Sequence, residues 1–329
     1  MLSYPRKNAL AHTPTPLNLL ERASERWGRG HRLWVKRDDL TGCTLSGNKV
    51  RKLEYITAHA QDNGYDTLIT CGGIQSNHCR ATAFAGAQLD MPVHLLLRGR
   101  QSAAPDGNLL LDRLAGATVN CYPVGQYVAE IDDIFLQWQA HYAAQGRKAM
   151  AIPTGGSDGI GLWGYLSACE ELSADFSANG IEQAHLVCAT GSGGTQAGLT
   201  VGTAVHSLPA KVWGVNVCDD ERYFLDKVAA DIIDWRQRFG GVPAADVKVR
   251  VLDGYVGEGY GRAGPEIFSL IAELSAMEGL VLDPVYTAKA FYGLLQEIEA
   301  GRFEGCRDIV FVHTGGIFGV FPQSAGFTW

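Results

Sequence analysis

The chain has 329 residues, of which 46% are hydrophobic and 19% charged, and its net charge is −7. These values are typical of a soluble globular protein of about two domains, and the negative charge gives no reason to expect a nucleic acid or a membrane surface as a partner. The N-terminus shows no apolar signal core and no apolar run reaches the length of a membrane span, so we expect a cytoplasmic protein. The eight cysteines are dispersed without a C-x-x-C motif, which indicates neither a metal site nor a disulfide framework.

Strand and helix patterns alternate along most of the chain. Strands are expected at 33–37, 67–71, 93–97, 118–121, 149–152, 185–188, 212–217 and 309–312. Helices are expected up to residue 27 and at 49–61, 77–89, 109–114, 128–145, 195–206, 222–239, 265–277 and 287–299. This alternation predicts an α/β fold with a parallel sheet covered by helices on both faces. The glycine-rich segment 153–159 is a candidate crossover between two lobes.

Three cations stand where a helix is expected to begin, namely Lys49, Arg51 and Lys52. Gly47 and Asn48 before them are typical of a loop, and the apolar residues after them keep helical spacing. Positive side chains at a helix N-terminus oppose the helix dipole, at a cost of about 0.3–1 kcal/mol each. A bound anion at this end explains the arrangement better than helix stability does, and a solvated basic first turn is the alternative.

Two glycine-rich loops lie where a strand leads into a helix, which is where open α/β sheets bind ligands. The loop 72–78, with the sequence GGIQSNH, suits a carboxylate or a phosphate, and a plain helix cap by Ser76 or Asn77 is the alternative. The loop 190–198, with the sequence TGSGGTQAG, can surround a phosphate with backbone N–H groups and hydroxyls. Gln196 breaks the dinucleotide pattern G-x-G-x-x-G at its third glycine, and no Walker-type motif occurs, so a compact monophosphate fits better than NAD or ATP.

Three later segments carry further candidate groups. Tyr260 stands between two glycines and can lie flat against a planar ligand, while Tyr286 opens a helix and can serve in acid-base chemistry. Half-buried packing is the ordinary alternative for either tyrosine. The segment 313–316, with the sequence HTGG, ends the last strand with another turn of backbone donors.

Taken together, these segments resemble the pyridoxal-phosphate enzymes of the tryptophan-synthase-β fold, in the branch of D-cysteine desulfhydrase and 1-aminocyclopropane-1-carboxylate (ACC) deaminase. The resemblance runs from residue 13 to 316 through the motifs KRDD at 36–39, GNKxRKLE at 47–54, GxQSN at 73–77, GTQAG at 194–198 and DPVYTxK at 283–289. It implies two open, mostly parallel twisted sheets with helices on both faces, and pyridoxal 5′-phosphate held between a large and a small domain. The implied large domain comprises 1–48 and 159–329, and the small domain 49–158.

The resemblance also implies roles for single residues. Lys49 is expected to form the Schiff base with pyridoxal phosphate and, once freed by the substrate, to accept the substrate's Cα proton. Lys49, Ser76 and Tyr286 are the expected catalytic residues. The cofactor is expected to contact Lys49, Lys52, Asn77, Ser192, Gly193, Gly194, Thr195, Tyr260, Thr287 and Thr314. The substrate, a small amino acid, is expected to contact Ser76, Asn77, His78, Tyr260 and Tyr286.

Two positions bear on the choice of substrate. Thr287 stands where the ACC deaminases have glutamate, and Thr314 where they have leucine, so both match the D-cysteine desulfhydrase pattern. The expected reaction is α,β-elimination from D-cysteine, giving pyruvate, hydrogen sulfide and ammonia in a homodimeric enzyme. The alternatives are an L-cysteate sulfo-lyase, an ACC deaminase, a non-catalytic pyridoxal-phosphate-binding protein and a nucleotide-dependent enzyme. In a sulfo-lyase the sulfonate can meet Arg80, Arg98 or Arg262.

Overall fold

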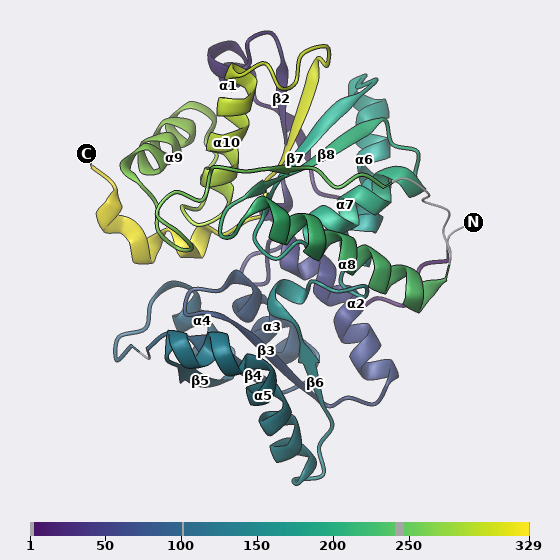
Figure 1. The fold of residues 1–329 in the computed structure, drawn as a ribbon, viewed down its shortest axis with the longest axis vertical. Helices are drawn as coiled ribbons and strands as arrows, with labels where there is room; N and C mark the ends of the chain where they lie inside the picture. The colour runs from purple at the N-terminus through teal and green to yellow at the C-terminus, as the bar shows by residue number, and fades with distance from the viewer. Residues whose placement is uncertain (1–2, 101, 241–246, 329) are drawn as a thin grey trace.

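The computed structural model describes residues 3–100, 102–240 and 247–328, and Figure 1 shows two lobes, one above the other. The upper lobe holds a six-stranded sheet in the order β1-β2-β10-β7-β8-β9, in which β1 and β2 pair antiparallel and the other neighbours pair parallel. Its strands are β1 (Leu17–Leu19), β2 (Arg32–Lys36), β7 (Ala184–Thr190), β8 (Ala210–Asn216), β9 (Val251–Leu252) and β10 (Asp308–Val312).

The lower lobe holds a four-stranded sheet in the order β5-β4-β3-β6, and every pair in it is parallel. Its strands are β3 (Thr67–Gly73), β4 (Val93–Arg98), β5 (Thr118–Tyr122) and β6 (Ala149–Ile152). The prediction of two mostly parallel sheets with helices on both faces is confirmed.

Helices cover both faces of each sheet because each sheet is apolar on both sides. One face of the large sheet packs against α1 (Glu21–Trp27), α9 (Pro265–Glu278) and α10 (Thr287–Glu299), and the other against α6 (Trp163–Asn179) and α7 (Gly194–Val205). One face of the small sheet packs against α5 (Val124–Ala143), and the other against α2 (Asn48–Asp62), α3 (Asn77–Gln88) and α4 (Gly107–Leu114). The remaining helix α8 (Glu221–Phe239) lies beside α7.

The two lobes share one apolar core. Leu68 and Leu95 of the small sheet belong to the same buried cluster as Trp163 of α6, Val201 of α7 and Trp235 of α8. The chain crosses from the large sheet to the small one after β2 and returns after β6, through the glycine-rich segment expected there. The expected domain limits at 48/49 and 158/159 lie at these crossings and stay a prediction.

The sequence did not predict the long helix α6. Its N-cap position, Leu162, makes no side-chain capping bond, and the glycines before it resemble a loop. Buried side chains from Trp163 to Phe176 point in several directions because α6 packs against α2, α7 and the sheet. A helix buried on most of its circumference shows no one-sided apolar stripe, which is the pattern that predicts a helix. The short strands β1 and β9 were also missed.

None of the helices in the described residues combines the length and the apolar composition that a bilayer span requires.

Glycine allows α6 and α7 to approach closely. A Cβ atom on Gly198 of α7 would lie 2.5 Å from Cβ of Tyr165 and 2.6 Å from the carbonyl oxygen of Leu162. Both contacts are too short for any side chain, so the two helices can keep this spacing only with glycine here. Since α7 begins at the glycine-rich loop, this contact also positions that loop.

Replacing Gly198 with alanine therefore forces α6 and α7 apart. We expect Gly198→Ala to lower the free energy of unfolding by about 1–3 kcal/mol, measured by urea denaturation. Gly125→Ala in α5 is the matched control, because no atom lies within 4 Å of the added Cβ and alanine favours a helix over glycine by about 1 kcal/mol. Equal effects at the two sites would contradict the packing argument.

Candidate active site

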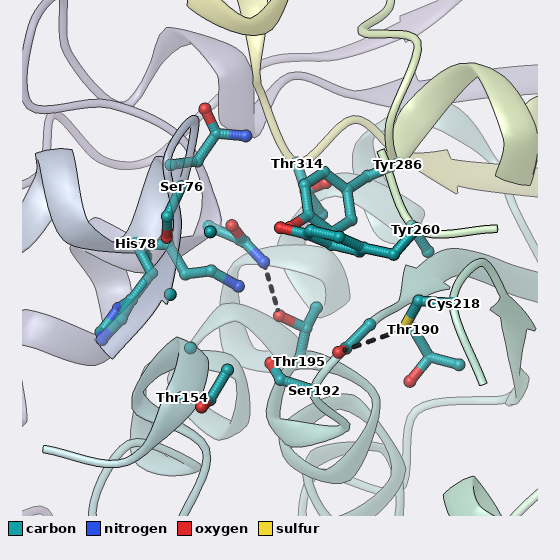
Figure 2. Close-up of a pocket in the computed structure, with 18 of the residues that line it drawn as sticks. Ser76, His78, Thr154, Thr190, Ser192, Thr195, Cys218, Tyr260, Tyr286 and Thr314 are labelled. Carbon is teal, nitrogen blue, oxygen red and sulfur yellow. Dashed lines mark hydrogen bonds between the residues drawn. The ribbon is translucent and has the colours of Figure 1, made fainter. Parts of the chain in front are cut away.

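A cavity of about 220 Å³ opens between the two lobes, at the carboxyl ends of the strands of both sheets. Its walls come from the ends of strands β3, β4, β6, β7, β8 and β10 or the segments after them, from the segment after β9, and from the starts of α2, α5 and α10. The loops that the sequence singled out therefore meet at one place (Figure 2). Of the expected site residues, the following line the cavity: Lys49, Ser76, Asn77, His78, Ser192, Gly193, Thr195, Tyr260, Tyr286 and Thr314.

Three expected residues do not line it. Lys52 and Gly194 lie directly behind the wall formed by the glycine-rich loop 190–198, and a Cβ on Gly194 would be 2.7 Å from Nζ of Lys52. Thr287 is the buried first residue of α10, and its Oγ1 donates to a carboxylate oxygen of Asp283 at 2.8 Å. Its hydroxyl is engaged in this bond, and contact between Thr287 and the cofactor stays a prediction.

Lys49 projects into the cavity from the first turn of α2. The start of this helix is fixed to the end of β10, since the Asn48 N–H donates to the Thr314 carbonyl at 3.1 Å and a Cβ on Gly47 would lie 2.7 Å from the same oxygen. Among the described residues we find no hydrogen-bond or ion-pair partner for the Lys49 amine. Burial lowers the pKa of Lys49 to about 8, so the neutral amine is a minor form near physiological pH but far more abundant than for an ordinary lysine.

Arg51 has a different role from the two lysines. Its guanidinium binds Asp38 at 2.9 Å and Glu171 at 2.7 and 2.9 Å, which ties α2 to the segment after β2 and to α6. Burial raises the pKa of Asp38, but the charge and hydrogen bonds of Arg51 outweigh this effect and lower it. The interpretation that all three cations at this helix start serve a ligand is therefore wrong for Arg51.

The loop before α7 has the form of an anion cradle. Gly193 adopts φ +86°, a conformation that favours glycine. The first N–H groups of α7 follow it and have no acceptor within the helix, and the first of them, that of Gly194, donates to Ser157 Oγ at 3.2 Å. A Cβ on Gly194 would also lie 2.6 Å from Oγ of Ser157, so the backbone here admits no side chain. Hydroxyls border the loop, with Ser192 and Ser157 joined at 2.8 Å and Thr195 accepting from Asn48 Nδ2 at 2.9 Å.

Lys52 places a positive charge behind this cradle. Only 1% of its surface is exposed, and Nζ donates to the Gly155 carbonyl and to Ser157 Oγ, both at 3.2 Å. Within the described part of the chain no carboxylate lies within ion-pair distance of it. Burial, and next to it the charge of Lys49, lower the pKa of Lys52 well below its usual value. An anion bound in the cradle would compensate this buried charge.

The opposite wall is the N-terminus of α3. Ser76 caps the helix by accepting from the Cys79 N–H at 3.2 Å, and Asn77 Oδ1 accepts from Asn108 Nδ2 at 3.0 Å. That bond leaves the amide N–H₂ of Asn77 as the group available to a ligand. Asn108 is fully buried in α4 and was not found from the sequence, because nothing local marks it as part of a site.

The imidazole of His78, which was expected to contact the substrate, is hydrogen-bonded to Thr70. The imidazole points away from Tyr260 and Tyr286 in Figure 2, and its Nε2 lies 2.8 Å from Oγ1 of Thr70. Thr70 Oγ1 donates to the Ile152 carbonyl, so His78 Nε2 is the donor to Thr70. Burial, with Lys49 and Lys52 nearby, lowers the pKa of His78 well below its usual value and keeps the ring neutral.

Two tyrosines close the cavity on the side of the large lobe. The hydroxyls of Tyr260 and Tyr286 are hydrogen-bonded at 2.7 Å, and their rings meet edge to face. Burial raises the pKa of both, so both phenols stay protonated at neutral pH. The Tyr260 ring lies against the backbone of Gly73, and the guanidinium of Arg98 stacks 5.0 Å from its centre.

Several wall residues were not singled out by the sequence as part of this cavity: Asn48, Tyr127, Thr154 and Cys218. Cys218 stands just after the end of β8, so the position of the strand end could have found it. Tyr127 comes from α5, far from any motif, and only the folded arrangement reveals it.

Comparison with known proteins identifies the family. The family model described as pyridoxal-phosphate dependent enzyme matches residues 9–315. The chain belongs to this family. It is 40% identical over 330 residues to the bifunctional D-cysteine desulfhydrase/1-aminocyclopropane-1-carboxylate deaminase of Arabidopsis thaliana, covering 96% of this chain and 79% of the relative. It is 36% identical over 326 residues to a D-cysteine desulfhydrase of Klebsiella pneumoniae, covering 97% and 96%.

A solved structure supports the same conclusion. A crystal structure of an ACC deaminase homologue superposes with a TM-score of 0.86 at 32% identity, covering 98% of this chain and 95% of that one. Pyridoxal phosphate is the cofactor of the family, and the cavity fits it. The glycine cradle with Lys52 behind it suits the phosphate, and Lys49 is the free amine in the cavity wall.

Lys52 offers a test of the phosphate site. We expect Lys52→Met to weaken binding of pyridoxal phosphate by about 10- to 100-fold, because hydrogen bonds to charged groups contribute about 1.5–3 kcal/mol. The cofactor-free variant should be at least as stable as the wild type, because a buried cation has been removed. Both are measured by absorbance titration and thermal unfolding.

Two controls make this test specific. Pyridoxal without its phosphate should bind the wild type and Lys52→Met equally, and Lys211→Met, at an exposed lysine, should change neither property. Equal losses for pyridoxal and pyridoxal phosphate would show that Lys52 does not hold the phosphate.

Proposed function

We propose that the protein is a pyridoxal-phosphate-dependent carbon-sulfur lyase that converts D-cysteine to pyruvate, hydrogen sulfide and ammonia. The observation that carries this proposal is the unpartnered Lys49 amine, with its pKa lowered to about 8, between a cradle for the cofactor phosphate and a helix N-terminus for the substrate carboxylate. An amine with this pKa can act both as the nucleophile that holds an aldehyde and as a base near neutral pH.

The cofactor, when bound, supplies an electron sink for the charge that develops on the substrate's Cα. The phosphate would rest on Ser192 to Thr195 with Lys52 behind it, and Asn77 would donate its amide N–H₂ to the ring hydroxyl. Tyr260 would lie beside the ring. These contacts orient the cofactor so that the Lys49 amine lies next to the substrate.

Lys49 then removes the Cα proton from the amino acid, since a neutral fraction of its amine is present at the working pH. The substrate carboxylate would bind at the N-terminus of α3, where Ser76 and the N–H groups of the first turn face the cavity. Tyr286 shares a hydrogen bond with Tyr260, so the pair retains one hydroxyl proton that can be directed toward the leaving group. The protonated state of both phenols favours a role as acid.

D-cysteine is preferred on the basis of two threonines. Thr314 presents a small polar side chain to the cavity where the ACC deaminases have leucine, and Thr287 replaces their glutamate. Without that glutamate we infer a weaker electron sink, which suffices when the leaving group is a thiolate. Relatives at 36–40% identity carry the name D-cysteine desulfhydrase, the name putative ACC deaminase, or both activities together. ACC therefore stands as the second candidate substrate.

A substrate panel tests the proposal. We expect D-cysteine to yield sulfide and pyruvate in equal amounts, with kcat/KM at least about ten-fold above L-cysteine, L-cysteate, D-serine and ACC. Lys49→Ala should lose activity by a factor of about 100–10,000, the usual contribution of acid-base catalysis, or more. Formation of 2-oxobutanoate from ACC alone would overturn the argument from Thr287 and Thr314.

We further propose a cytoplasmic homodimer, as the family resemblance and the sequence lead us to expect, with residues 49–158 as its small domain.

A further inference from the structure

Arg98 is the arginine that lines the cavity among the described residues. Two other arginines were candidates for contact with an anionic substituent. Arg80 is buried elsewhere, where it donates to the Ser46 carbonyl at 3.0 Å and stacks 4.9 Å from the ring of Phe318. Arg262 is exposed and does not contribute to the cavity wall. Of the three candidate arginines, Arg98 therefore lines the cavity, and Arg80 and Arg262 do not.

The position of Arg98 is fixed by the small sheet. It is the last residue of β4 and pairs in register with Gly73 of β3, which leads into the loop at the start of α3. Its guanidinium stacks 5.0 Å from the ring centre of Tyr260 and 5.8 Å from that of Tyr127. Two aromatic faces therefore hold the planar group while its N–H groups remain at the edge.

Within the described residues, neither a carboxylate nor any other hydrogen-bond acceptor is found for these guanidinium N–H groups. The charged side chains that line the cavity are Lys49, Arg98 and Asp219, and Asp219 is exposed. The N-terminus of α3 can bind the substrate carboxylate without Arg98. The positive charge of Arg98 is therefore available for a second anionic group of the substrate.

We infer that Arg98 is a specificity-determining residue that binds an anionic sulfur substituent on the Cβ atom of the substrate. This inference rests on the proposed lyase function for its substrate class. During elimination the Cα–H bond breaks and its proton passes to Lys49, the Cα=Cβ double bond forms, and the Cβ–S bond breaks with both of its electrons passing to sulfur. With cysteate, Arg98 binds the sulfonate and then the sulfite that leaves; with cysteine the thiol is neutral, and Arg98 meets the charge only on the hydrosulfide that leaves.

A non-reacting probe tests this without turnover. 3-Sulfopropanoate has the carboxylate and sulfonate of cysteate but no amine, and butanoate has the carboxylate alone. In titration calorimetry of the cofactor-loaded enzyme, we expect Arg98→Met to raise the Kd of 3-sulfopropanoate at least about ten-fold. The Kd of butanoate should change by less than about two-fold. Arg98→Lys should lie between, because it keeps the charge and loses the planar fork.

Arg100→Met is the matched control, since Arg100 is exposed and lies outside the cavity wall, and it should change neither probe. Turnover gives a second readout, in which Arg98→Met should lower kcat/KM for cysteate more than for β-chloroalanine, whose substituent is uncharged. Equal losses for all ligands, or no loss for 3-sulfopropanoate, would overturn the inference and leave Arg98 as a clamp on Tyr260. Calorimetry reports on this even if the wild type eliminates nothing from D-cysteine, so the two proposals fail separately.

Discussion

The site depends on two lysines of one helix turn, of which Lys49 lines the cavity and Lys52 lies buried behind the glycine-rich loop. Lys49 and Lys52 stand three residues apart in α2, so both side chains lie on the same face, while Arg51 between them points toward Asp38 and Glu171. Arg51 anchors the helix, and we propose that Lys49 supplies the reactive amine and Lys52 a charge behind the glycine cradle. The three side chains leave the same turn in different directions or reach different distances from the helix, so each can contact a different partner.

This arrangement is unfavourable without a ligand. Burial lowers the pKa values of Lys49 and Lys52, which means that the fold disfavours the charge that each carries in water. A bound phosphate would offset that cost for Lys52, and a low pKa would keep the Lys49 amine reactive. Lys49 and Lys52 also repel each other when both are charged. The apolar cluster shared by the two lobes and the close contact of α6 with α7 hold the glycine cradle in place against this repulsion.

The α/β fold and the loops that form the site could be predicted from the sequence, because these loops carry glycines and hydroxyls at the ends of apolar strands. The convergence of 72–78, 190–198 and the start of α2 follows from the topology of parallel sheets. Side-chain direction could not be predicted. Arg51 looks like Lys52 in sequence, and His78 looks like a ligand-facing group until its bond to Thr70 is seen. The helix α6 was missed because it is buried on several sides, and Asn108 and Tyr127 reach the site from distant elements.

The central claim is that Lys49 is the residue to which the cofactor is covalently attached. Borohydride reduction of the cofactor-loaded protein, followed by peptide mapping, tests it most directly. The account predicts a stable pyridoxyl adduct on the peptide that contains Lys49, at one equivalent per chain, with Lys52 unmodified. An adduct on any other lysine, or none after reduction of a protein that shows the cofactor's absorbance, would contradict it.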